Sequence, residues 1–250
     1  MKKHLSVFGL YARSSLFRVI GILLLMCAVE VAFFHFELQD ALKAYEVVGS
    51  GMASLERMFK MAATNVYFRI ALVLITIVIC LPGCEFKSKT GYTLRRLTIS
   101  ERAVFFHQAA YNLLVYIMLF AVQLTLVFAL SQYYLSAVPK ECISNQTMFL
   151  AFYRNDFLHS LLPLEDVGLW IRNGLLIITF ALATAEYPYR QRRHKFSSTA
   201  LALLTYTIVW FDQDIGQLGH IITTGIIALM LIGTTAYILT RNDEEAAQDE

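Results

Sequence analysis

Long runs of apolar residues, separated by short polar segments, dominate the chain from residue 16 onward. A helix rises 1.5 Å per residue, so about 20 apolar residues cross the roughly 30 Å hydrocarbon layer of a membrane. Most of the runs meet this length, while the fifth is short and the third is so long that it must tilt or begin as an interfacial helix. The pattern predicts an all-α integral membrane protein with six transmembrane helices, at residues 16–36, 62–81, 104–135, 167–185, 196–211 and 220–240.

The composition favours the same environment. Of the 250 residues, 57% are hydrophobic and 16% are charged, whereas soluble chains are about half apolar and a quarter charged. The surplus of apolar side chains has no soluble core to enter, so lipid is its natural solvent. No polar stretch is long enough to form a separate soluble domain. We therefore expect residues 1–250 to form a single transmembrane domain.

Lys and Arg are distributed unevenly among the segments that connect the predicted helices. With the N-terminus inside, the inner segments carry about three times as many of these cations as the outer segments. Cytoplasmic loops of membrane proteins show this excess. We therefore predict that both termini are cytoplasmic, with an N-terminal interfacial helix at residues 5–16 and an acidic cytoplasmic tail at residues 241–250.

The segment between the second and third predicted helices carries the most informative pattern. After Gly91, apolar residues at positions 94, 97 and 99 surround the cations Arg95 and Arg96. This spacing is typical of a short amphipathic helix that lies parallel to the membrane and docks on a structure beneath it. The residues alone are equally consistent with an ordinary basic loop held near anionic lipid.

The sequence of residues 92–101, Tyr-Thr-Leu-Arg-Arg-Leu-Thr-Ile-Ser-Glu, resembles the cytoplasmic loop between spans two and three of type-2 ABC transporter permeases. Six spans, inner termini and an N-terminal interfacial helix are also similar to that family. The resemblance implies a coupling helix that seats in a groove of a separate ATPase. Its apolar plug would be Leu94, Leu97 and Ile99, its polar rim Arg95, Arg96 and Glu101, and Thr93, Thr98 and Ser100 would complete the contact.

The chain also departs from that family. Type-2 permeases commonly place re-entrant outer helices between spans five and six, whereas only residues 212–219 separate these spans here. The outer gate of such a transporter is therefore not predicted by the resemblance.

No G-x-x-x-x-G-K-[ST] phosphate loop occurs in the sequence. The chain is therefore not expected to be an enzyme or to bind a cofactor, because ATP hydrolysis by that route needs the loop. The resemblance places ATP and Mg on one or more partner ABC ATPase subunits. Since six spans are few for a complete pathway, we expect a dimer with a second copy or with a homologous permease.

Polar residues inside apolar spans are costly and mark candidate functional positions. Glu30 and Arg69 fall at similar depth in the outer halves of the first two spans, where they are predicted to form an ion pair or to contact substrate. Gln123 is predicted to hydrogen-bond across helices or to line the pathway. Snorkelling toward the membrane surface accounts for the residues that flank the fourth span, which are Arg172, Glu186 and Arg190.

Other reactive residues give no catalytic or metal-binding pattern. Asp212, Asp214 and His220 are close in sequence, but an exposed turn between two spans explains them better than a metal site, which needs further ligands. The four cysteines lie in or beside apolar runs or in a loop, without the spacing of a zinc site or a disulfide framework; they are Cys27, Cys80, Cys84 and Cys142. No metal site is therefore predicted.

Two functions remain open from the sequence. The first is the permease subunit of an ATP-driven exporter in a bacterial plasma membrane, acting on an amphipathic substrate such as a peptide, a drug or a lipid-linked molecule. The second is a non-transporting membrane scaffold or sensor that binds a peptide or lipid at its outer face. The apolar and aromatic outer segment at residues 149–162 favours the second.

Overall fold

The computed structural model describes residues 2–49, 51–84 and 100–246. It is 85% helical, and the part described contains no strand. The helices in chain order are α1 (Lys2–Val48), α2 (Leu55–Met61), α3 (Thr64–Cys80), η1 (Leu81–Gly83), α5 (Glu101–Ala137), η2 (Lys140–Cys142), α6 (Thr147–Arg154), α7 (Asp156–Leu161), α8 (Val167–Gln191), α9 (Thr199–Trp210) and α10 (Gly216–Ala246).

Four of these helices are long and apolar enough to cross a membrane, namely α1, α5, α8 and α10. The consecutive helices α2 and α3 meet at an angle of 49° and together form a fifth candidate span. The bend lies at Ala63, whose φ of 51° places a non-glycine residue in the left-handed region. The chain is therefore a helical membrane protein with four or five candidate membrane-spanning helices.

The predicted fifth span, at residues 196–211, is only partly helical. α9 has 12 residues, which extend about 18 Å at 1.5 Å per residue and fall short of the hydrocarbon thickness. α1 is longer than the predicted first span. It runs without a break through residues 5–16, which were predicted to form a separate interfacial helix.

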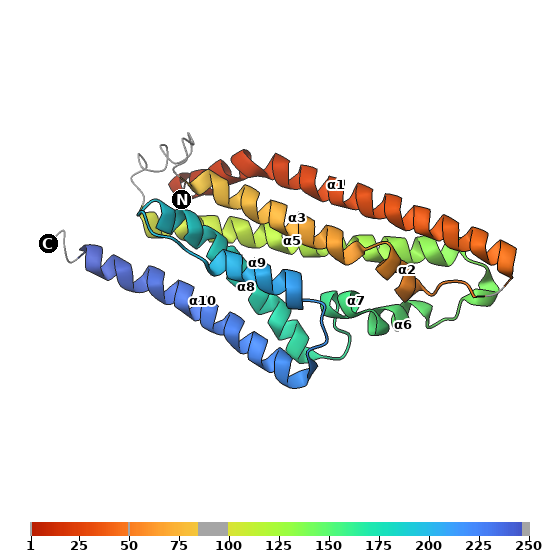
Figure 1. Cartoon of the computed structure of the whole chain (residues 1–250). Coiled ribbons are helices and arrows are strands. Elements are labelled where there is room, and N and C mark those ends of the chain that lie inside the picture. Colours follow the sequence, from red (N-terminus) through yellow and green to blue (C-terminus); the bar gives the residue numbers. More distant parts are fainter. Residues whose placement is uncertain (1, 50, 85–99, 247–250) are drawn as a thin grey trace.

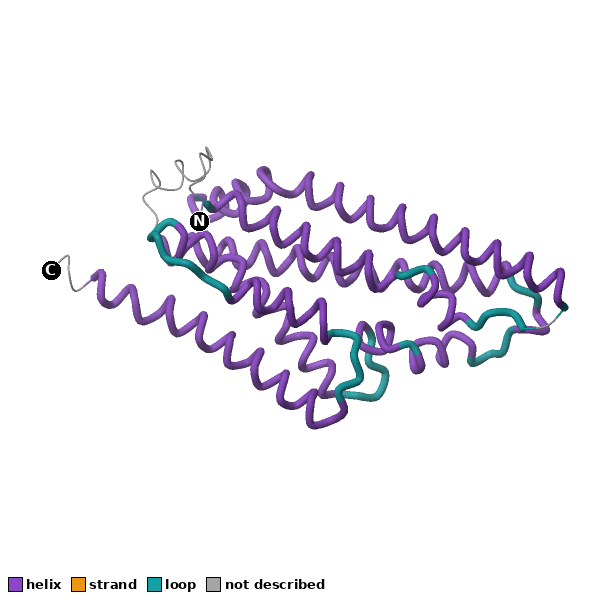
Figure 2. Tube along the Cα trace, in the orientation of Figure 1, coloured by secondary structure: helices purple, strands orange, loops and turns teal. Residues whose placement is uncertain are grey.

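The helices α1, α3, α5, α8, α9 and α10 form an elongated bundle and run in alternating directions along it (Figure 1). The start of α1 and the end of α10 lie at the same end of this bundle. α5 packs along both α1 and α8, whereas α10 packs mainly against α8 and forms one edge. Helix and loop segments are distinguished in Figure 2, where the α8–α9 loop lies at the end that holds the termini and the break between α2 and α3 lies midway along the molecule.

α1 and α5 extend well beyond the other helices at the end opposite the termini (Figure 1). α1 has 47 residues and is about 70 Å long, more than twice the hydrocarbon thickness. The short helix α2 packs against α1 and α6, α6 stacks Phe152 on Phe128 of α5, and α7 packs against α6. Tyr134 of α5 donates a hydrogen bond of 2.7 Å to the carbonyl of Ala53, and Asn155 donates one of 3.1 Å to the carbonyl of Glu56. We call this region the outer end, after the side of the membrane on which it is predicted from the sequence to lie.

An aromatic cluster centred on Phe68 of α3 joins the outer end to the spans. Its ring centroid lies 5.3 Å from that of Phe120, 5.6 Å from that of Phe157 and 6.1 Å from that of Phe211. These partners belong to α5, to α7 and to the residue after α9. Phe68 therefore holds four separate chain segments together.

Replacing Phe68 with Ala is expected to lower the free energy of unfolding by about 3–5 kcal/mol, because a fully buried ring is lost and a cavity remains. The thermal unfolding midpoint of the detergent-solubilised protein measures this change. The matched control is Ile70→Ala on the same helix, where the side chain is 50% exposed. Equal destabilisation by the two substitutions would contradict the role assigned to Phe68.

Candidate functional site

An ion pair at the outer end connects α3 to the turn between α9 and α10. Nη2 of Arg69 is paired with Oδ1 of Asp212, and Nδ2 of Asn65 donates a hydrogen bond of 2.9 Å to Oδ2 of the same carboxylate. Asn65 and Arg69 are four residues apart and so share one face of α3. The Asp212 side chain is only 8% exposed. The turn that was predicted to be exposed therefore contains a buried, fully engaged carboxylate.

Two adjoining cavities lie beside this ion pair and together form what we call the outer cleft. The first has a volume of about 970 Å³ and is bounded by α2, the start of α3, the α6–α7 junction and the turn after α9. The second has a volume of about 680 Å³ and lies against the starts of α8 and α10. Asp156 and Gln213 line both cavities.

The two cavities differ in charge. The first is lined by the exposed cations Arg57, Lys60 and Arg154 as well as by carboxylates. The second has no Lys or Arg in its lining but contains four carboxylates and two histidines, namely Asp156, Glu165, Asp166, Asp214, His159 and His220. The outer cleft is therefore a polarised surface with room for a ligand of substantial size.

Arg172 of α8 lies behind the second cavity and is fully buried. Its Nε and Nη2 donate to Oδ1 of Asn173 at 3.4 and 3.2 Å, and its Nη1 lies 3.4 Å from Nδ1 of His220. The ring of Phe211 lies 5.3 Å from the guanidinium carbon. The prediction that Arg172 snorkels to the surface is wrong, because neighbouring helices cover this face of α8 and supply polar and aromatic partners.

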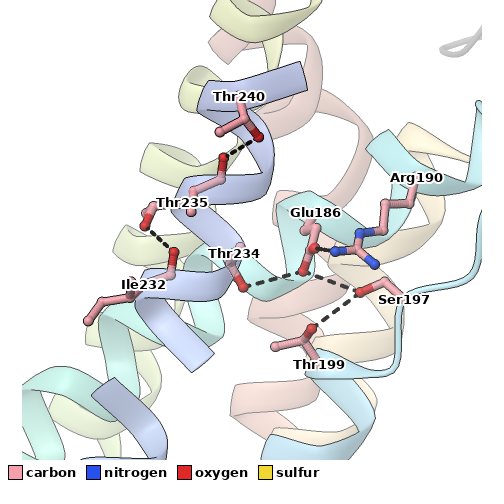
Figure 3. A network of polar contacts seen from close by, with 9 residues as sticks. Glu186, Arg190, Ser197, Thr199, Ile232, Thr234, Thr235 and Thr240 are labelled. Carbon is pink, nitrogen blue, oxygen red and sulfur yellow. Dashed lines mark hydrogen bonds and ion pairs between the residues drawn. The ribbon is translucent and has the colours of Figure 1, made fainter. Parts of the chain in front are cut away.

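Glu186 forms the centre of a second polar cluster, near the opposite end of α8 (Figure 3). The carboxylate is fully buried and lies 2.6 Å from Nη2 of Arg190. Ser197 and Thr234 donate hydroxyl hydrogen bonds of 3.2 and 3.4 Å to its Oε2. The Arg190 guanidinium lies 3.9 Å from the centroid of the Tyr237 ring. The cluster joins α8, the α8–α9 connection and α10, so snorkelling does not explain Glu186 either.

Most of the predicted ATPase contact lies outside the described residues. This applies to Thr93, Leu94, Arg95, Arg96, Leu97, Thr98 and Ile99. Ser100 and Glu101 are described and form the start of α5. The Ser100 hydroxyl accepts a hydrogen bond of 3.4 Å from the backbone N–H of Ala103, as an N-cap residue does. Oε2 of Glu101 lies 3.2 Å from Nη2 of Arg193, just beyond α8.

The structure does not pair Glu30 with Arg69. Arg69 faces Asp212, while Oε2 of Glu30 accepts a hydrogen bond of 3.0 Å from Nε2 of Gln123 on α5. The two residues have similar depth, but their side chains leave the helices toward different neighbours. Sequence position indicates depth and does not indicate which neighbouring helix a side chain faces. The predicted cross-helix hydrogen bond of Gln123 is present.

Further polar contacts join three spans in the bundle interior. Nδ2 of Asn112 donates to Oγ1 of Thr184 at 2.9 Å, linking α5 to α8. The hydroxyls of Thr76 and Tyr116 lie 2.9 Å apart, linking α3 to α5. The sequence analysis did not single out these residues, although polar side chains within apolar runs are a usable signal for such contacts.

The described ranges contain no group of three or more His, Cys, Asp or Glu residues that could hold a metal ion. The four cysteines, all of which are described, form no disulfide. Burial raises the pKa of the Cys84 thiol to about 11, because the positive charge of nearby Arg192 lowers this pKa by less than burial raises it.

The fold and the polar clusters define the protein as an all-helical membrane protein with a charged cleft at one end of its bundle. No protein family matches the sequence, and no curated protein and no solved structure is significantly similar to the chain.

Replacing Asp212 with Asn is expected to lower the free energy of unfolding by about 1–3 kcal/mol, because the Arg69 guanidinium loses its counter-charge in a largely buried site. Unfolding of the detergent-solubilised protein measures the change. The control is Asp214→Asn in the same turn, where the side chain is exposed and Asn can still accept from the N–H of Gly216. A similar loss in both variants would argue against the ion pair.

Proposed function

We propose that this chain is the membrane-spanning permease subunit of an ATP-driven transporter of the ABC type, which exports an amphipathic substrate such as a peptide, a drug or a lipid-linked molecule. The proposal begins from the resemblance of residues 92–101 to the coupling loop of type-2 ABC permeases. The contacts made by the residues that follow this loop support it.

The junction at Glu101 is the observation that carries the proposal. α5 begins there, at the end of the proposed coupling segment, and Glu101 is ion-paired with Arg193 just beyond α8. α5 also packs along α8 and along α1. A push on residues 93–99 from a closing ATPase would therefore act on two helices at once, and such rigid-body shifts of helices are a common form of conformational switch.

In this proposal the chain crosses the membrane six times. The helices α1, α2–α3, α5, α8 and α10 supply five crossings, and α9 with its flanking residues supplies the sixth. The start of α1 and the end of α10 lie at the same end of the bundle (Figure 1), as an even number of crossings requires. The excess of Lys and Arg in the segments at that end supports a cytoplasmic location, in a bacterial plasma membrane.

The energy source and the second half of the pathway are assigned to partners. The sequence lacks a phosphate loop, so ATP and Mg would be bound by ABC ATPase subunits. A second copy or a homologous permease would complete the pathway. The clusters at Glu186 and at Asp212 then lie at the inner and outer ends of one subunit, where the first joins α8 to α10 and the second joins α3 to the α9–α10 turn.

The outer cleft favours a second candidate function. Its cavities of about 970 and 680 Å³ are lined by charges from several helices, among them the short helices α2, α6 and α7. A scaffold or sensor that binds a charged peptide or lipid headgroup at its outer face would use this cleft without transporting anything. The two functions differ in whether the segment 93–99 is needed.

Affinity purification of the tagged chain from its native membranes is expected to recover an ATPase with a phosphate loop. Arg95→Glu combined with Leu97→Glu should abolish this association, because a charge is reversed in the rim and a second is placed in the apolar plug. Lys87→Glu with Lys89→Glu is the control, since these residues precede Gly91 and lie outside the proposed contact. Recovery of no ATPase, or its full retention by the first variant, would contradict the proposal.

The orientation can be tested with the native cysteines. Cys142 is exposed in η2 at the outer end, so a membrane-impermeant maleimide should label it in intact cells. Cys84 should stay unlabelled there, because it is buried at the other end and burial raises its thiol pKa to about 11, while the thiolate is the reactive form.

Cys142→Ser is the control and should abolish the labelling of intact cells. Labelling of Cys142 that requires permeabilised cells would show that the outer end faces the cytoplasm, and would contradict the proposed orientation.

A further inference from the structure

Glu30 of α1 and Gln123 of α5 form an isolated polar pair in the apolar interior of the bundle. Both side chains are 0% exposed. Nε2 of Gln123 donates to Oε2 of Glu30 at 3.0 Å. The two remaining oxygens, Oε1 of Glu30 and Oε1 of Gln123, are buried without a hydrogen-bond partner. An ionised carboxylate and an amide oxygen can only accept hydrogen bonds, so these two oxygens cannot form a hydrogen bond with each other.

No counter-charge in the described part of the chain lies within ion-pair distance of Glu30. On α3, the cation Arg69 is engaged by Asp212. On α5, no charged or histidine residue occurs between His107 and the end of the helix at Ala137. On α1 itself, the nearest titratable neighbour is Cys27, which is not a cation.

An unpaired carboxylate in such a place is strongly disfavoured. Burial in a medium without water removes the solvation of the charge, and groups in this position become neutral instead. A neutral carboxylic acid also differs in hydrogen bonding, because its protonated oxygen is a donor.

We propose that Glu30 is a proton-binding site that locks α1 to α5. With the proton on Oε1, Glu30 donates to Oε1 of Gln123 while Gln123 donates to Oε2 of Glu30, which gives a closed acid–amide pair. One proton thereby satisfies both oxygens that are otherwise without a partner. Loss of the proton would leave a carboxylate facing the amide oxygen, and the contact between the two helices would weaken.

Other occupants fit the pair less well. A metal cation such as Ca²⁺ or Mg²⁺ needs about six or more oxygen ligands, and the pair offers two free oxygens. A water molecule that donates to both oxygens would complete the hydrogen bonds, but it would leave the buried negative charge uncompensated. The proton site does not depend on the proposed transport function, because it rests only on the packing of α1 against α5.

Infrared spectroscopy of the purified protein in lipid nanodiscs at neutral pH tests the proposal. The wild-type protein should show the carbonyl absorption of a protonated carboxyl group, and Glu30→Gln should remove it. Gln123→Leu keeps the acid but removes its partner, so the absorption should remain and change frequency. Glu37→Gln, a substitution of another glutamate on α1, should leave the absorption unchanged.

The stability of the variants provides a second measurement. Glu30→Gln can form the same two hydrogen bonds as an amide pair, so its unfolding midpoint should stay close to that of the wild type, while Glu30→Leu should lower it by leaving Gln123 without a partner. A wild-type spectrum without protonated carboxyl absorption would overturn the proposal. An unchanged absorption in Glu30→Gln would also overturn it. If Glu30→Gln does not fold, an unchanged absorption in Gln123→Leu would overturn it instead.

Discussion

A polar group inside a lipid bilayer has no water with which to form hydrogen bonds, and this constraint underlies most of the structure. It requires helices, because each backbone N–H and C=O must be paired within its own segment. It also favours buried polar side chains that have partners on a neighbouring helix or on the backbone of their own helix. Arg172, Glu186 and Asp212 have such partners in clusters that hold α8, α9 and α10 to each other and to α3. The polar contacts therefore specify which helices are neighbours.

The positions of the helices were largely predictable, because long apolar runs leave few alternatives. The helix ends were less predictable. α8 runs to Gln191 rather than ending at residue 185, since Glu186 and Arg190 resemble a membrane boundary in sequence but are paired in the structure. The shortness of α9 was visible in the short fifth run. The continuity of α1 was not visible, because its N-terminal turns are basic and aromatic rather than uniformly apolar.

The candidate site was predicted less completely than the fold. The hydrogen bond of Gln123 and the importance of Glu30 and Arg69 follow from the cost of polar groups in apolar spans. The partners of these residues could not be predicted in the same way. Asp212, for example, is 143 residues from Arg69 in the sequence and looks like a residue of an exposed turn. Pairings of this kind depend on the rotation of each helix about its axis, which the apolar pattern of a fully hydrophobic span hardly constrains.

The 12-residue length of α9 has a consequence for the surrounding lipid in the six-span topology proposed above. One of its faces carries exposed apolar residues, including Leu201 and Val209, and this face would contact lipid chains. The helix is about 12 Å shorter than the hydrocarbon layer. Thinning of the adjacent bilayer would accommodate the part of this difference that the flanking residues do not span, at a cost of fractions of a kcal/mol per Å. Lipids with short acyl chains would then be favoured beside α9, and the protein would select part of its own lipid boundary through the length of a single helix.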